Sequence, residues 1–201
     1  MDKEIMDANP KQPEVGYESL REAGYLGQDR ASLFLTAKGL KPATILELVF
    51  EPGHQEYTEN DYKSDIGDCE QMLRDLGLPY EPEHYNDDKD LERHIFLVGK
   101  DQQSLGDLAT AERADSSDYY SYGMALGKAL GYPKTAISAD ATKSAMPISE
   151  YPQELLNDPS RKFCVFALSR EHWQEEMEVV KQQAEFIKKE DPSLYNAILN
   201  N

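Results

Sequence analysis

The sequence has only two cysteines in 201 residues, Cys69 and Cys164. Disulfide-stapled domains and structural zinc sites need more of these residues, at characteristic spacings. Cys69 lies in a segment with helical periodicity and Cys164 lies inside an apolar run, so both are interpreted as small hydrophobic residues. The two cysteines therefore indicate neither a disulfide framework nor a structural zinc site.

Long apolar runs are also missing. No stretch approaches the roughly 18 to 20 consecutive apolar residues of a membrane span, and the opening MDKEIMDANPKQPEVG has no apolar signal-peptide core. We therefore expect no membrane partner and a cytoplasmic location.

Basic residues are scarce. The chain has 21 Lys and Arg residues against 38 Asp and Glu residues, which gives a formal net charge of -17. A nucleic-acid-binding protein needs a basic face to neutralise phosphates, and no Lys/Arg cluster supplies one. The range 59–92 alone carries twelve acidic residues and three basic ones. This pattern argues against nucleic acid and favours a basic protein partner or cations.

Sequence motifs of known chemistry are absent too. The chain has no Gly-x-Ser-x-Gly elbow, no Gly-x-Gly-x-x-Gly loop and no convincing pairing of a cysteine with a histidine. The acidic turn at 86–90 lacks the spacing and the closing glutamate of a calcium loop. We expect no metal site, and the cofactor is unknown.

The hydrophobic content of 39% and the length suit a single domain over 16–201, preceded by a flexible arm over 1–15. Apolar runs predict core strands at 44–50, 94–98 and 163–168, with an edge strand at 80–85. Helices are predicted over 17–23, 29–38, 58–76, 102–113 and 117–130, and along the segment that follows Ser169. The predicted fold class is α/β or α+β, with three layers, a mixed sheet of three to five strands and helices on both faces.

Three glycines at a spacing of four, Gly123, Gly127 and Gly131, fall on one face of a predicted helix. Each glycine destabilises a helix by roughly 1 kcal/mol relative to alanine, so these three glycines, here called the glycine stripe, require an explanation. Tight packing against another element is one reason. A ligand in the groove, with Gly123 and Gly127 as binding residues, is the other.

The end of this segment reads Gly-Lys-Ala-Leu-Gly-Tyr-Pro over 127–133. It resembles the Gly-x-x-Leu-Gly-Tyr-Pro stretch of an uncharacterised family, a domain of unknown function, and the resemblance extends from about Tyr119 to the C-terminus. Members of that family tend to have cysteines directly after the proline, where this chain has Lys134, Thr135 and Ala136. The resemblance therefore implies no metal or redox role, and it transfers no activity.

Two groups of residues are candidates for catalysis or binding. Glu47 lies within the first apolar strand, where a buried carboxylate either meets a donor or serves as a general base. If the core strands run parallel, their carboxyl ends meet at one edge of the sheet, where open α/β sheets bind ligands. That edge would bring together Glu51, His54, Lys100, Asp101, Ser169 and Arg170.

At that edge, His54 with Glu51 or Asp101 would move a proton, while Lys100, Arg170 and Ser169 at the start of the last long helix would hold an anion. Two functions follow from these features. The first is an acidic binding or regulatory module that contacts a basic protein partner or cations. The alternative is a small-molecule enzyme that acts on an anionic substrate at the strand ends. A homodimer joined by the glycine stripe or by the last long helix is compatible with either.

Overall fold

The computed structural model describes residues 13–52, 57–87 and 91–200. The predicted arm, 1–15, lies almost wholly outside these residues. None of the helices in the described part of the chain is long and apolar enough to cross a bilayer. The elements are, in chain order, α1 (Pro13–Glu22), η1 (Gly24–Leu26), α2 (Asp29–Ala37), β1 (Ala43–Phe50), α3 (Glu59–Leu76), β2 (Tyr80–Asp87), β3 (Leu91–Gly99), α4 (Gln102–Glu112), α5 (Tyr119–Ala129), α6 (Lys134–Ala141), η2 (Ile148–Glu150), α7 (Gln153–Leu156), η3 (Pro159–Phe163), α8 (Trp173–Glu190) and α9 (Pro192–Leu199).

The sheet has three strands in the order β1-β3-β2, and both pairings are antiparallel. Ala43 lies opposite Gly99, and Phe50 lies opposite Glu92. The predicted edge strand is confirmed as β2, which lies at the border of the sheet and contains Pro82. Proline has no backbone N–H to donate, so it is tolerated in an edge strand but not in a central one. The expectation of a mixed sheet is wrong, because the described strands include no parallel pair.

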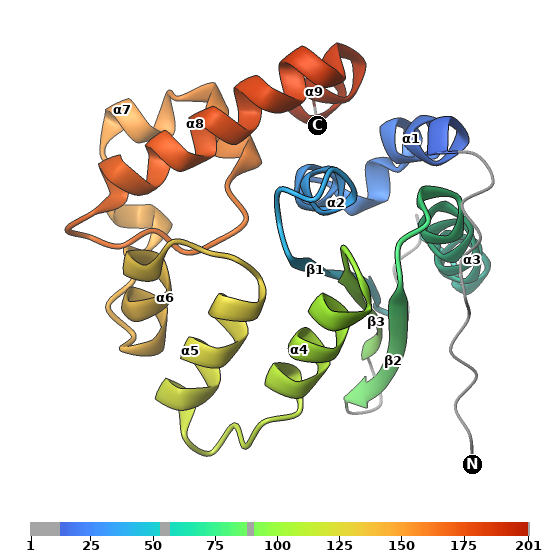
Figure 1. The fold of residues 1–201 in the computed structure, drawn as a ribbon, viewed down its shortest axis with the longest axis horizontal. Helices are drawn as coiled ribbons and strands as arrows, with labels where there is room; N and C mark the ends of the chain where they lie inside the picture. The colour runs from blue at the N-terminus through green and yellow to red at the C-terminus, as the bar shows by residue number, and fades with distance from the viewer. Residues whose placement is uncertain (1–12, 53–56, 88–90, 201) are drawn as a thin grey trace.

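Helices cover both faces of the sheet, so the predicted three-layer α/β or α+β class is confirmed (Figure 1). Alternate residues of a strand point to opposite faces. Leu46 and Leu48 of β1 join the main core, to which α1, α2 and α3 contribute. Ala43 of β1 and Leu97 of β3 belong to a smaller cluster with α4 and α5 on the other face.

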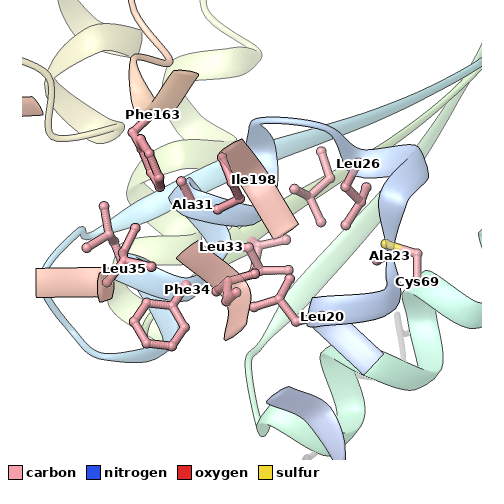
Figure 2. Packing of buried hydrophobic residues seen from close by; sticks show 14 of the residues in the cluster. Leu20, Ala23, Leu26, Ala31, Leu33, Phe34, Leu35, Cys69, Phe163 and Ile198 are labelled. Carbon is pink, nitrogen blue, oxygen red and sulfur yellow. The ribbon is translucent and has the colours of Figure 1, made fainter. Parts of the chain in front are cut away.

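Helix α2 lies at the centre of the main core. Its residues from Arg30 to Thr36 are all buried, which is typical of a helix enclosed on every side. In Figure 2, Leu33, Phe34 and Leu35 of this helix lie among side chains from neighbouring elements, including Ile198 of α9. The helix contacts β1, α1 and α8, and so it connects the sheet to the C-terminal helices.

The predicted helix over 58–76 is confirmed as α3, with both of its expected ends. Thr58 and Asp61 form a reciprocal capping box, in which the Thr58 side chain accepts a hydrogen bond from the Asp61 backbone N–H. Gly77 ends the helix with a φ of 69°, a left-handed conformation that favours glycine.

The predicted third core strand, 163–168, is wrong. Phe163 ends the short helix η3, and the segment after it makes no strand pairing with the described residues beyond a single bridge between Ser169 and Ala145. Phe163 and Leu168 are fully buried, which explains the apolar run. Between these two ends, Cys164, Val165 and Phe166 are half-buried and Ala167 is exposed, so this segment is a partly exposed connection between η3 and α8 rather than part of a sheet.

Replacing Leu33 with alanine tests the central place of α2. Leu33 is 0% exposed, so Leu33→Ala should lower the free energy of unfolding by about 2 to 5 kcal/mol, through lost burial and a residual cavity. Leu40 is 56% exposed and serves as the matched control. Leu40→Ala should change the free energy of unfolding by less than about 0.5 kcal/mol. Urea unfolding measures both, and equal losses would contradict the assignment of α2 to the core centre.

Candidate functional site

The predicted cluster at the strand ends is not assembled. Because β1 and β3 are antiparallel, Lys100 and Asp101 follow the end of β3 that lies beside the start of β1, whereas Glu51 follows the other end of β1. An antiparallel strand rises about 3.4 Å per residue, so the two ends lie roughly 24 Å apart. His54 lies outside the described residues. The alternative function, an enzyme at the strand ends, therefore loses its geometric premise.

Glu47 and Asp101 each have a structural partner. Glu47 is exposed rather than buried, and it accepts a hydrogen bond from Arg93 Nη1 at 3.2 Å. Asp101 precedes α4 and accepts a hydrogen bond from the Ser104 backbone N–H at 2.7 Å. The hydrogen bonds from Ser104 hold the pKa of Asp101 below its usual value. Asp101 is a helix cap.

Ser169 and Arg170 hold the turn before α8. The Ser169 backbone N–H donates to Glu176 Oε2 at 2.8 Å, and the Ser169 hydroxyl accepts from the His172 backbone N–H. The Arg170 guanidinium makes a bidentate ion pair with Glu150 and also donates to the carbonyl of Ser144. Since its donors are engaged within the chain, Arg170 is not poised for a ligand anion.

The two glycines predicted as binding residues pack against α6 and also line a pocket. A Cβ atom at Gly127 would lie 2.7 Å from Ile137 Cγ1, and one at Gly123 would lie 3.3 Å from the Ala141 Cβ. The glycines thus allow α5 and α6 to approach closely, as the packing hypothesis predicted. The same residues line a pocket of about 240 Å³, which we call the α5–α6 pocket.

One face of α5 forms a wall of the α5–α6 pocket, since its lining residues recur at helical spacing of three and four. Part of α6 and the segment 165–167 complete the lining. Helices α5 and α6 lie beside one another in Figure 1. The lining residues are Tyr119, Tyr122, Gly123, Leu126, Gly127, Leu130, Tyr132, Ala136, Ile137, Asp140, Val165, Phe166 and Ala167.

Aromatic rings and one carboxylate give the pocket its chemical character. Four rings line it, and those of Tyr132 and Phe166 lie 5.5 Å apart between centroids. Among the described residues, Asp140 is the one charged side chain of the lining. Burial raises the pKa of Tyr132 to about 12, and the charges of Asp29 and Asp140 add to the rise. At neutral pH the phenol of Tyr132 is therefore uncharged.

Two lysines already make cation–π contacts with tyrosines of this pocket. Lys143 Nζ lies 4.8 Å from the centroid of the Tyr119 ring, and Lys41 Nζ lies 4.7 Å from that of Tyr132. Ring faces attract ammonium and guanidinium groups at such distances. One face of each of these two rings is therefore already occupied by a lysine of the chain.

Lys41 belongs to a buried polar group next to Tyr132. It is 3% exposed, and its Nζ donates to Ser32 Oγ at 2.7 Å, while Thr44 Oγ1 donates to the same oxygen at 2.8 Å. Burial lowers the pKa of Lys41 to about 8, against an opposing effect of Asp29. Burial raises the pKa of Asp29 to about 6. This group anchors α2 to β1 behind the pocket.

The described residues show no cluster of three or more His, Cys, Asp and Glu side chains that could hold a metal ion. Comparison with protein-family models, with curated proteins and with solved structures gives no match. The resemblance to the uncharacterised family over the Gly-x-x-Leu-Gly-Tyr-Pro segment stays a prediction. The pocket is therefore the basis for an argument about function.

The glycine stripe pointed to one wall of the pocket, but sequence reasoning missed its aromatic and acidic residues. Tyr119 stands four residues before Gly123, and Tyr122 stands three residues after Tyr119, so helical spacing could have placed both rings near the stripe. Phe166 and Asp140 come from a misassigned strand and from a separate helix. No local pattern joins these two residues to α5.

The depressed pKa of Lys41 predicts a pH-dependent stability. Folding disfavours its charged form, and this cost disappears as pH rises from about 8 toward the ordinary value of 10.5. The free energy of unfolding of the wild type, relative to Lys41→Met, should therefore increase between about pH 8 and pH 9.5, by up to about 1.4 kcal/mol per pH unit for one linked proton. Urea unfolding across this range measures the difference.

Lys38→Met is the control, since Lys38 is an exposed lysine of the same segment. It should keep the pH dependence of the wild type. If Lys41→Met kept that dependence as well, Lys41 would not be the group that folding holds in its neutral form.

Proposed function

We propose that this chain is a non-catalytic binding module, in which the α5–α6 pocket holds a cationic side chain of a basic protein partner. The observation that carries the proposal is a pocket lined by four aromatic rings, in which Asp140 is the one charged lining residue among those described. Ring faces and a carboxylate together favour guanidinium and ammonium groups, and aromatic cages are the usual sites for such cations.

The size of the pocket favours a side chain over a larger ligand. Sites for drug-sized molecules have volumes of about 300 to 1,000 Å³. The α5–α6 pocket has about 240 Å³, which suits one long side chain or a compact organic cation. The described residues that line it include no histidine, cysteine, serine or lysine, so they offer no familiar pair of nucleophile and base.

The overall charge supports the same class of partner. A net charge of -17 attracts basic proteins. Salt screens this attraction over a Debye length of about 10 Å at 0.1 M. Several acidic side chains of α3 and β2 are already paired inside the chain, among them Glu70 with Arg74, and Glu81 and Glu83 with Arg113. The acidic surface therefore steers a partner, and the pocket supplies the specific contact.

Neutralising Asp140 tests this assignment. A hexa-arginine peptide, titrated calorimetrically at low salt, should bind the wild type, and Asp140→Asn should weaken binding by roughly 10- to 150-fold, since a lost charge-assisted hydrogen bond costs about 1.5 to 3 kcal/mol. Asp68→Asn is the matched control, because it removes one exposed charge from α3. It should change the affinity less than about twofold.

A hexa-citrulline peptide keeps the shape of the side chain without its charge and should not bind. Tyr119→Leu keeps an apolar side chain on the rim of the pocket but removes a ring face, and should also weaken binding. Equal effects of Asp140→Asn and Asp68→Asn would mean that only the diffuse surface charge attracts the peptide, and would count against the pocket.

A further inference from the structure

Arg161 differs from the other arginines in the described part of the chain. Its guanidinium makes no side-chain hydrogen bond or ion pair with any described residue, and its Nε atom is buried without a partner. The remaining described arginines all donate side-chain hydrogen bonds, namely Arg21, Arg30, Arg74, Arg93, Arg113 and Arg170. An unpaired guanidinium is notable in a chain of net charge -17, where carboxylates are abundant.

Arg161 lines a second pocket, of about 310 Å³, which we call the Arg161 pocket. It lies along the segment 164–168, and Val165, Phe166 and Ala167 line both this pocket and the α5–α6 pocket. Gln28 and Tyr151 add neutral polar groups, while the other lining residues are mainly apolar. A buried donor that lacks a protein acceptor costs free energy unless a ligand or water satisfies it.

Glu176 lies next to the Arg161 pocket without lining it, because it accepts a hydrogen bond from the backbone N–H of Ser169, the residue after Leu168 of the lining. It is 1% exposed, and its Oε1 atom has no hydrogen-bond partner among the described residues. Burial raises the pKa of both Tyr151 and Cys164; Glu176 adds to each rise, and Arg161 opposes it. Both side chains thus lie within electrostatic reach of Arg161 and Glu176. Arg161 is the one charged residue among the described residues that line this pocket, which suits a ligand with one negative charge.

We propose that the Arg161 pocket binds a small organic monocarboxylate with an apolar body. Arg161 lines this pocket and has no side-chain partner among the described residues, so its guanidinium can donate to one carboxylate there. The apolar body would contact Val165, Phe166 and Leu168. This site is separate from the cation site of the proposed function, because it has the opposite charge and a different polar lining.

Calorimetric titration with benzoate, as a representative monocarboxylate, tests the site in the full chain. Benzoate should bind the wild type saturably with a dissociation constant of about 1 mM or lower. Arg161→Gln should weaken binding at least tenfold, and Arg161→Lys, which keeps the charge without the fork, should give an intermediate loss. Because Arg161 has no side-chain partner to lose among the described residues, the Arg161→Gln variant should keep the melting temperature of the wild type.

Lys162→Gln is the matched control, since it removes one positive charge from the adjacent, exposed position, where Lys162 donates to the carbonyl of Leu199. It should leave the affinity for benzoate unchanged, and benzamide should not bind the wild type. The proposal is overturned if benzoate fails to saturate, or if Arg161→Gln and Lys162→Gln reduce its affinity equally. Tighter binding of inorganic phosphate than of benzoate would also overturn the monocarboxylate class.

Discussion

The burial of α2 on every side is the constraint on which the rest of the structure depends. A helix as short as Asp29–Ala37 is marginal in isolation, so its stability comes from the elements that enclose it. Phe34 contacts the rings of both Tyr17 and Phe186, which lie in α1 and α8. The Arg30 guanidinium donates to backbone carbonyls of Arg21, Gly27 and Ala197 and so ties distant parts of the chain to α2. Each neighbour of α2 is therefore held in place by the same helix.

This constraint also positions the candidate sites. Ser32 of α2 accepts hydrogen bonds from Lys41 and Thr44, and Lys41 in turn lies over the Tyr132 ring of the α5–α6 pocket. Tyr132 contacts Phe166, whose segment lines both pockets. A continuous set of contacts thus runs from the buried helix to the two pockets. Their opposite chemistry, with Asp140 lining one and Arg161 the other, underlies the proposal of a cation site and a carboxylate site in one fold.

Local patterns were sufficient to predict the three strands and the helix α3, but neither every element nor the arrangement of the elements. The strands β1, β2 and β3 and the helix α3 were predicted because alternation, apolar runs and caps depend on neighbouring residues. The strand predicted over 163–168 was wrong, because an apolar run does not show whether its residues have a pairing partner. Glu47 was expected to be buried, but it is exposed and pairs with Arg93, a residue of the neighbouring strand that no local pattern around Glu47 identifies. The glycine stripe correctly indicated close packing, whereas the pocket beside it depends on contacts between residues far apart in the sequence.

The most direct test of the proposed cation site is an NMR titration that follows the tyrosine rings, with arginine amide as the probe. The account predicts saturable shifts at Tyr119, Tyr122 and Tyr132, because these rings line the pocket with Asp140. Shifts confined to the acidic helix α3, or no saturable shifts at any of the three rings, would contradict it.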